Sequence, residues 1–456
     1  MSALTTFASS TVTLCRLRMR LCALATFMFS CTTQYNAYSA PPILPGATGF
    51  GIDTVAGSGR HLPKARSSIY IITNLRDEGP RSLRDCVNQR GPRTCLFATS
   101  GQIFLSKAIR IKNPFITIAG QTAPRPGITL RGAGLSVETH DVLIQHLAIR
   151  PGDSRGGQPP EQRDGVSIGA APPRTAFNVV LDHLSLTWAI DENASTAYST
   201  THDITISHSL IAEGLHRSIH PKGPHSKGLM IGDGSKRISI LRNVLAFNEE
   251  RNPYLKPDTS TEFINNVVYG WGPNGGWSLC NISNYDNSSL PIELTFIGNT
   301  YKPGPSSAPL WPLYAKSTPL GNQIFEADTI APARPENVPT AKTASVFSPP
   351  IASPGTISLP ATQAYPLVLE TVGSRPGQRS RIDSRIIADI QRGTGDLKDC
   401  LSGCRRAAGS PRSPRQVWRV PKLPPKPFAD TNKDGYTDLE NWLHSRAMAV
   451  ERLRSR

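Results

Sequence analysis

Short alternating strands recur along the middle of the chain, and they constrain its fold more than any other feature. Each run alternates apolar with polar or small residues, which is the period of a strand with one buried face. The segments between the runs are too long for tight hairpins and lack the pattern of an amphipathic helix. The runs start at Val142, Val179, Ile204, Ile238, Phe263 and Leu294, so successive starts differ by 37, 25, 34, 25 and 31 positions.

Repeats of this length predict an all-β fold, a parallel β-helix, in which each coil needs a neighbour to bury its apolar face. Polar residues recur at similar offsets after four of the strand starts, at Ser209, Asn243, Asn266 and Asn299. Stacked side chains at these positions would hydrogen-bond one another along the axis and so satisfy their buried polar groups. A β-sandwich with ordinary turn asparagines is the alternative that these patterns leave open.

The N-terminus has the pattern of a signal peptide. Three arginines precede the apolar run Leu21–Phe29, and Ala37–Ser39 offers small residues for cleavage. We therefore expect residues 1–39 to be removed and the product to be secreted and soluble, with no membrane span. Anchoring as a lipoprotein through Cys31 is disfavoured, because the bulky Phe29 stands where a small residue is usual.

Composition divides the rest of the chain into three parts. We assign residues 40–300 to the β-helix. Residues 301–360 contain twelve prolines, so 301–366 is predicted to be an irregular Pro-rich segment. Residues 367–456 form an irregular C-terminal extension, in which the apolar spacing becomes helical at Ile382–Ile390.

The charge of the chain indicates its partner. The formal net charge of +16 falls to +13 when the three leader arginines are subtracted. A basic secreted protein attracts polyanions. Signatures of helix-turn-helix, zinc-finger and aromatic RNA-binding modules are missing, so we expect an acidic polysaccharide and no nucleic acid. Solubility alone is the other explanation of the charge. We expect a monomer.

Loss of the leader would leave five cysteines, and secretion permits disulfides. Cys86 with Cys95 and Cys400 with Cys404 are the local pairings to test first, although spacing does not fix connectivity. Cys280 would then be the odd cysteine. The spacings do not match a zinc site.

The tail carries oxygen side chains at positions one, three and five of a calcium loop and Gly435 at position six. Asn441 stands at position twelve, where the EF-hand rule needs glutamate, and the glutamate comes one place early. A structural calcium ion and an acidic helix cap both remain open. The candidate ligands are Asp430, Asn432, Asp434, Asp438 and Glu440.

Six short motifs follow one another between Gly49 and Thr300: Gly49-Phe-Gly, Gly79-Pro-Arg-Ser-Leu-Arg84, Ile116-Thr-Ile-Ala-Gly-Gln-Thr-Ala-Pro124, Leu181-Asp-His-Leu-Ser185, Trp188-Ala-Ile-Asp-Glu192 and Arg251-Asn-Pro253. In this order they resemble the pectate lyases of polysaccharide lyase family one. The resemblance implies a right-handed, single-stranded parallel β-helix. It also implies a calcium-dependent enzyme that cleaves de-esterified polygalacturonate by β-elimination to unsaturated oligogalacturonides.

The resemblance implies a calcium site made of carboxylates. Asp164 and Asp191 match family calcium ligands, and Glu192 stands beside the second. The family often has a further acid four residues before Asp191, where this chain has Thr187. Glu192 would compensate for it, or the substrate would supply the missing oxygens. Asp191 and Glu192 also fit a simpler role as the cap of a coil.

The resemblance also implies which cations act on the substrate. Arg251 matches the catalytic arginine, Lys227 matches the lysine that neutralises the substrate, and Lys256 stands where a second substrate-binding arginine is frequent. A lysine there keeps the charge but loses the bidentate fork. Because the free pKa of arginine is above ~12, the site has to lower the pKa of Arg251 for it to act as a base.

The pair Asp182-His183 has the composition of a catalytic pair, but histidine recurs at the same strand position as His146 and His208. We interpret these histidines as structural, packing or hydrogen-bonding within the stack. Two other functions stay open. A polygalacturonase-type hydrolase shares the β-helix but needs acids placed for attack by water. A non-catalytic β-helix would bind polysaccharide without cleaving it.

Overall fold

The computed structural model describes residues 41–62, 66–154, 156–232, 234–273, 280–283, 290–308, 312–316, 321–332, 344–345, 349–399 and 420–452, all within one compact unit. The predicted leader, with Cys31, lies outside the described residues, as does the proposed pairing of Cys400 with Cys404.

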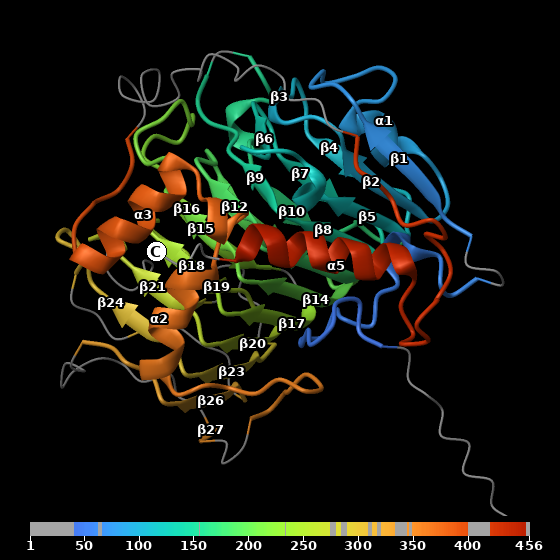
Figure 1. Ribbon diagram of the computed structural model, residues 1–456. Helices are drawn as coiled ribbons and strands as arrows, with labels where there is room; N and C mark the ends of the chain where they lie inside the picture. Colours follow the sequence, from blue (N-terminus) through green and yellow to red (C-terminus); the bar gives the residue numbers. More distant parts are fainter. Residues whose placement is uncertain are drawn as a thin grey trace, which may run out of the picture. The chain divides into compact units, whose positions relative to one another are not determined.

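Three parallel sheets, here called A, B and C, are built by successive coils, and from β3 to β25 the strands enter sheets B, C and A in turn (Figure 1). Sheet A contains β1 (Ser68–Ile72), β2 (Arg93–Phe97), β5 (Ile116–Ala119), β8 (Val142–Gln145), β11 (Ala176–Asp182), β14 (Thr201–Ser207), β17 (Lys236–Leu241), β20 (Ser260–Ile264), β23 (Glu293–Ile297), β26 (Gln323–Ala327) and β27 (Ala344–Ser345). Sheet B contains β3 (Gly101–Phe104), β6 (Ile128–Arg131), β9 (Leu147–Ile149), β12 (Ser185–Thr187), β15 (Leu210–Ala212), β18 (Val244–Ala246), β21 (Val267–Tyr269) and β24 (Thr300–Lys302). Sheet C contains β4 (Ile109–Ile111), β7 (Leu135–Val137), β10 (Val166–Ile168), β13 (Glu192–Thr196), β16 (Lys227–Ile231), β19 (Tyr254–Leu255), β22 (Cys280–Ser283) and β25 (Leu313–Lys316).

This topology confirms the predicted parallel β-helix, and the β-sandwich alternative is wrong. All six predicted strand starts fall in sheet A, where Val142, Val179, Ile204 and Ile238 are partners in register. The sheets continue beyond residue 300, since β25, β26 and β27 lie in the segment that was predicted to be irregular.

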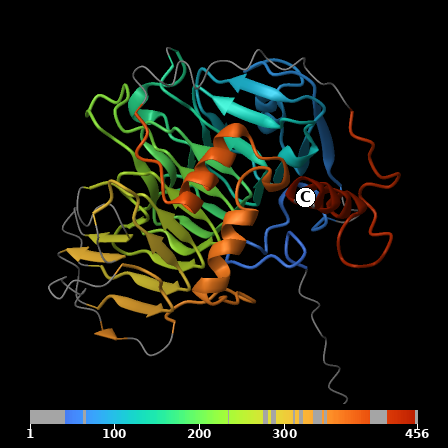
Figure 2. The same cartoon turned by 60° about the vertical axis from the view of Figure 1, so that its left-hand side comes forward.

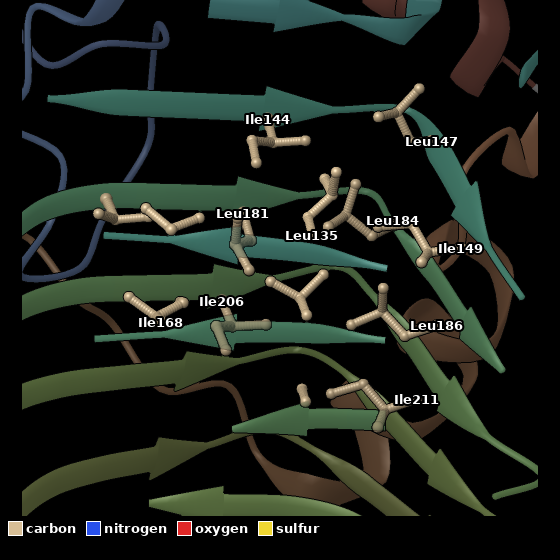
Figure 3. Packing of buried hydrophobic residues seen from close by; sticks show 14 of the residues in the cluster. Leu135, Ile144, Leu147, Ile149, Ile168, Leu181, Leu184, Leu186, Ile206 and Ile211 are labelled. Carbon is tan, nitrogen blue, oxygen red and sulfur yellow. The ribbon is translucent and has the colours of Figure 1, made fainter. Parts of the chain in front are cut away.

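The interior of the coils is one apolar core. Side chains of sheet A such as Ile144, Leu181 and Ile206 stack in register from coil to coil. Leu186 and Ile211 of sheet B and Ile168 of sheet C meet them inside the coil (Figure 3). Each coil therefore buries its apolar face only against its neighbours, as the repeat predicts.

The corner between sheets A and B is short and regular. From β11 to β24 it contains two residues, of which the first adopts a left-handed φ, as at His183 (52°), His208 (47°) and Asn265 (55°). The second residue of each corner lies inside the coil. Four of these second residues are Ser209, Asn243, Asn266 and Asn299, all fully buried.

These polar residues form the predicted ladder. The backbone N–H of Ser209 donates to Asn243 Oδ1 (2.8 Å), and the N–H of Asn243 donates to Asn266 Oδ1 (2.9 Å). The N–H of Asn266 donates to Asn299 Oδ1 (2.8 Å). Because each amide oxygen serves the next coil, the ladder satisfies buried polar groups and holds neighbouring corners in register.

The histidines at the first corner position also stack. The ring centroids of His146 and His183 are 5.1 Å apart, and those of His183 and His208 are 4.8 Å apart. Asp182 accepts hydrogen bonds from the Nδ1 atoms of His183 (2.8 Å) and His208 (3.3 Å). The structural interpretation of these histidines is therefore confirmed.

Helices from the C-terminal part cover two of the three sheets. Helices α2 (Ala361–Thr371) and α3 (Arg381–Arg392) pack on the outer face of sheet B through Val368 and Ile386. Helix α5 (Asp438–Glu451) packs on sheet A, where Leu439 and Leu443 contact Leu96 and Ala119 (Figures 1 and 2). The extension is thus helical in three places, including the predicted segment at Ile382–Ile390, and not irregular throughout.

Two local features of the N-terminal coils match their residues. Helix α1 (Leu83–Asn88) is joined to β2 by the predicted disulfide between Cys86 and Cys95. Gly51 lies so close to sheet A that a Cβ atom there would be 2.5 Å from the carbonyl oxygen of Val179, so only glycine fits. Among the described helices, none combines the length and apolar character that crossing a bilayer requires.

Asp141 ties the N-terminal segment to sheet A at the turn before β8. Its Oδ1 atom accepts hydrogen bonds from Thr54 Oγ1 (3.0 Å) and the N–H of Val55 (3.2 Å), and its Oδ2 atom pairs with His140 Nδ1 (2.8 Å). Burial opposes its ionisation, but these hydrogen bonds and the charge of His140 hold the pKa of Asp141 below its usual value. The folded state therefore favours the ionised carboxylate.

We predict that Asn266→Ala lowers the free energy of unfolding by about 2–4 kcal/mol. The change leaves the N–H of Asn243 and the carbonyl of Ile240 buried without their partners, and such a group costs about 1–3 kcal/mol. Urea unfolding followed by circular dichroism measures the effect. Asn88→Ala on the exposed end of α1 is the control, expected within about 0.5 kcal/mol of wild type. Equal effects of the two changes would contradict the ladder's role.

We also predict that Asp141→Asn flattens the acid limb of the stability curve. A carboxylate with a depressed folded pKa stabilises the protein above the unfolded pKa of about 3.9, and this contribution is lost as pH falls through the folded pKa. Urea unfolding of both proteins between pH 3 and 6 tests this. As pH falls, the free energy of unfolding should decrease more steeply in wild type than in Asp141→Asn, by the amount expected for about one titrating group. Asp203→Asn is the matched control. Asp203 has the same φ as Asp141 (54°) and also precedes the apolar run of its strand, but its side chain is more exposed than that of Asp141. Parallel curves for wild type and Asp141→Asn would contradict the prediction.

Candidate active site

The predicted site residues gather where the chain enters the strands of sheet C. Asp164 precedes β10, Glu192 opens β13 and Lys227 opens β16. Glu192 is the register partner of Lys227, and Lys227 forms a parallel bridge with Glu250. Parallel strands in register place equivalent residues side by side, so positions far apart in sequence become one column of charged side chains.

Three carboxylates form the centre of this column. Oxygen atoms of Asp164, Asp191 and Glu192 all lie within 4.8 Å of one another. The backbone N–H of Glu192 donates to Asp164 Oδ1 (3.3 Å), which fixes two neighbouring coils relative to each other. Such a concentration of negative charge needs compensating cations or protons.

Two cations and one histidine lie along this column of acids. Arg251 Nη1 donates to Glu192 Oε1, and Lys227 Nζ pairs with Glu250 Oε2. His225 Nε2 lies 2.8 Å from Asp191 Oδ1. The Arg251 guanidinium also lies 5.6 Å from the ring centroid of Tyr254 on sheet C, within reach of a cation–π interaction.

The two aspartates carry different charge as a result. Burial and the nearby charge of Asp191 raise the pKa of Asp164 to about 7, with Arg251 opposing part of the shift. Burial also disfavours the charge of Asp191, but the hydrogen bond and charge of His225, with the charge of Arg251, hold its pKa below the usual value. The site therefore favours the ionised form of Asp191, whereas Asp164 has too little positive charge nearby to favour its ionised form.

Because the carboxylates have too little positive charge around them, the cluster is a suitable site for a hard divalent cation. Calcium prefers carboxylate oxygens, and Asp164, Asp191 and Glu192 supply three of them at adjacent positions. Glu192 would have to share its carboxylate between the ion and Arg251. The donor set fits calcium better than a soft metal, which would favour nitrogen or sulfur.

Two residues named from the sequence lie away from the cluster. Lys256 follows β19 at its carboxyl end, whereas Arg251 precedes the same strand, so the strand separates them along sheet C. Thr187 ends β12 in sheet B and is fully buried. The cluster thus assembles its three carboxylates without a contribution from the Thr187 position.

The left-handed backbone conformation of Arg251 does not by itself distinguish it as a site residue. Its φ is 65°, but Trp188, Glu213 and Phe247 at the corners after sheet B also have positive φ. The prediction of Arg251 comes from the motif resemblance, and its contacts with Glu192 and Tyr254 place it beside the carboxylates.

Comparison with known proteins shows which proteins the chain resembles. No protein-family model matches the sequence. Probable pectate lyase C of Aspergillus flavus is 34% identical over 301 residues, which are 66% of this chain and 62% of that protein. The protein of the same name from Emericella nidulans is 38% identical over 234 residues, which are 51% of this chain and 49% of that protein.

The chain is a homologue of the pectate lyases.

Solved structures support the fold of this pectate lyase homologue. The cedar pollen allergen jun a 1 superposes with a TM-score of 0.51 at 18% identity, over 72% of this chain and 92% of that chain. A pectate lyase studied for its substrate specificity and anti β-elimination mechanism also gives 0.51, at 11% identity, over 75% and 99% of the two chains. At these identities the likeness shows the fold alone. The chain spans about three-fifths of the length of the first curated relatives it matches, 62% and 59%.

Some residues at the site of this pectate lyase homologue were not predicted from its sequence. Glu250 precedes Arg251 directly and pairs with Lys227. His225 bonds Asp191, and its ring stacks on His220 with centroids 3.8 Å apart. His220 and His225 both fall in the long segment between β15 and β16, and that cluster of histidines before a predicted site lysine is the signal that could have indicated them.

The tail loop of this pectate lyase homologue engages its acids within the chain. Asp430 accepts from the N–H groups of residues 434 and 435, and Asp434 accepts from the side chains of Asn432 and Asn441. Glu440 forms a capping box with Thr437 at the start of α5. The cap alternative therefore holds for Glu440, and calcium binding by Asp430, Asn432, Asp434 and Asp438 stays a prediction.

Proposed function

We propose that the chain is a secreted, calcium-dependent pectate lyase that cleaves de-esterified polygalacturonate by β-elimination to unsaturated oligogalacturonides. The single observation that carries the proposal is the meeting of Arg251 with the carboxylates of Asp164, Asp191 and Glu192. A base beside a cation-binding cluster is the combination that this elimination needs. The curated relatives named as probable pectate lyases support the same reaction.

The position of the cluster suits a long acidic substrate. The C-terminal helices pack on sheets A and B, whereas Arg251, Lys227 and Lys256 lie along sheet C. The chain as a whole carries a formal net charge of +16. With calcium bound at the carboxylates, these cations would attract and orient a polyuronate on the sheet that the helices leave open.

Each residue then has a defined task in the proposed reaction. Calcium would be held by Asp164, Asp191 and Glu192, and when bound it would supply positive charge to the uronate carboxylate and acidify the neighbouring C–H bond. Arg251 would exchange Glu192 for the substrate and release one guanidinium proton to solvent, and the neutral guanidine would then take the C–H proton at the nitrogen so freed. Lys227 would add positive charge next to Glu250, and His225 would hold Asp191 in its ionised, oriented state. The pair of electrons left on carbon expels the glycosidic oxygen and forms the new double bond.

Secretion and a second calcium ion belong to the same proposal. The basic, apolar and small-residue pattern of residues 1–39 supports export. The oxygen side chains at Asp430, Asn432 and Asp434 support a structural ion in the tail.

We predict that Arg251→Ala lowers kcat on polygalacturonate by at least about 100-fold, the usual contribution of a general base. The ultraviolet absorbance of unsaturated ends, followed beside total reducing sugar, measures the loss. Arg237→Ala is the control, because Arg237 pairs with Asp203 outside the site. Thermal unfolding of both variants shows whether the fold survives, and Arg251→Lys keeps a cation beside Glu192 if the alanine variant is unstable.

The same two readouts, applied to the wild-type protein, distinguish the three functions considered for this chain. New reducing ends without ultraviolet absorbance would indicate a hydrolase, and affinity for polygalacturonate without new ends would indicate a binding protein. Either outcome with calcium present would overturn the proposed lyase.

We predict that activity is lost on chelation and that Asp191→Asn raises the calcium concentration for half-maximal activity by at least about tenfold, because a charged oxygen ligand is removed. Initial rates in calcium-buffered polygalacturonate measure the shift. Asp258→Asn, which breaks a surface pair with Lys236, is the charge-matched control. An unchanged calcium dependence in Asp191→Asn would remove Asp191 from the metal site.

A further inference from the structure

A second group of potential metal ligands lies far from the carboxylate cluster, at the corner between sheets A and B. His146, Asp182 and His183 come from two neighbouring coils, are all buried, and offer ligand atoms within 4.8 Å of one another. Glu451 at the end of α5 reaches the same place: its Oε1 atom lies 3.3 Å from His146 Nε2 and 3.9 Å from His183 Nδ1. The reaction proposed above uses none of these side chains.

The hydrogen bonding of His146 leaves one ring nitrogen unexplained. Its Nδ1 atom lies 2.9 Å from the carbonyl oxygen of Ser374, which can only accept, so Nδ1 carries the proton. In the neutral ring Nε2 is then a bare lone pair. This Nε2 is fully buried and makes no hydrogen bond of good geometry within the described residues. Burial lowers the pKa of His146, which favours the neutral ring, although the Glu451 carboxylate opposes part of this shift.

A lone pair that faces a carboxylate across 3.3 Å needs a positive charge between them. An added proton on Nε2 would be opposed by burial of the ring. A metal ion would satisfy the His146 lone pair and the Glu451 carboxylate together. The cluster thus has a polar atom whose natural partner is a cation.

The spacing of the donor atoms suits a tetrahedral ion. Bonds of about 2.0–2.1 Å to nitrogen and oxygen place tetrahedral ligand atoms about 3.3–3.4 Å apart. The observed separations are 3.3 Å between His146 and Glu451, 2.8 Å between His183 Nδ1 and Asp182 Oδ2, and 3.9 Å between His183 and Glu451. They scatter around the required value, so small side-chain shifts would complete the geometry.

The surroundings hold the ligands in place as outer partners of metal sites do. Asp182 Oδ1 accepts from Ser207 Oγ (2.8 Å) and His208 Nδ1 (3.3 Å), and Asp182 Oδ2 accepts from Gln145 Nε2 (3.0 Å). The carbonyl of Ser374 fixes the ring of His146. Both carboxylate oxygens and one ring are therefore oriented by residues outside the donor set.

We propose that His146, Asp182, His183 and Glu451 bind a transition-metal dication of the Zn²⁺ type, as a structural site that fastens α5 to the β-helix. Two imidazoles and two carboxylates favour such an ion over calcium, which takes oxygen ligands. Binding exchanges the His183–Asp182 hydrogen bond for two metal bonds, and the His183 ring then holds its proton at Nε2. Because α5 is joined to the coils through this site, metal binding stabilises the folded chain.

The test is titration of the chelator-treated, full-length protein with Zn²⁺ in saturating Ca²⁺, by calorimetry, together with the visible spectrum of the Co²⁺ form. We expect one tight equivalent, an intense tetrahedral Co²⁺ spectrum and a rise in Tm. His146→Asn and Glu451→Gln should each weaken Zn²⁺ binding by at least about 100-fold, since each removes a direct ligand. Asn suits the left-handed φ of 58° at position 146, and Glu451 lies at a helix end, so the metal-free variants should fold.

Two histidine controls locate the bound ion. His202→Asn alters an exposed His–Asp pair and should leave the Zn²⁺ affinity unchanged. His220→Asn tests the other histidine group, Asp191 with His220 and His225. No tight Zn²⁺ equivalent, an equivalent that persists in both His146→Asn and Glu451→Gln, or one lost only in His220→Asn would each overturn the proposed site.

Discussion

Pairing of parallel strands in register from coil to coil is the interaction on which the rest of this structure depends. It converts residues roughly 20 to 40 positions apart into columns, and three features of the chain are such columns. The ladder from Ser209 to Asn299, the stacked rings of His146, His183 and His208, and the charged entry to sheet C all follow from it. A slip of one residue in a coil would turn its apolar side chains outward and break every column that passes through that coil.

The fold was predictable because its signals are local and repeated. Alternation in each run identified the strands of sheet A, and the recurring Asn243, Asn266 and Asn299 indicated which face lay inside. The positions of the helices on sheets A and B were harder to predict from the sequence, because their burial depends on contacts with strands more than 100 residues earlier. Ile386 and Leu443 have helical spacing in the sequence, but nothing local says which sheet they cover.

The site was predictable in part, and for a different reason. Motif resemblance led to Asp164, Asp191 and Arg251, which the structure brings together. Glu250 was missed because a single glutamate has no pattern. His225 lies in a histidine-rich segment, but its partner Asp191 comes from another coil. The meeting of His146 with Glu451, 305 positions apart, has no sequence signal at all.

The unequal corners of the coils have a consequence for how such a protein can change. The corner between sheets A and B is fixed at two residues from β11 to β24, whereas the connection from sheet B to sheet C has four residues between β12 and β13 and fourteen between β15 and β16. Insertions in the long connection leave strand register intact, because the chain re-enters sheet C at the same point. The scaffold can therefore be inherited almost unchanged while the segments beside the charged entry to sheet C diversify, which separates the evolution of specificity from the evolution of folding.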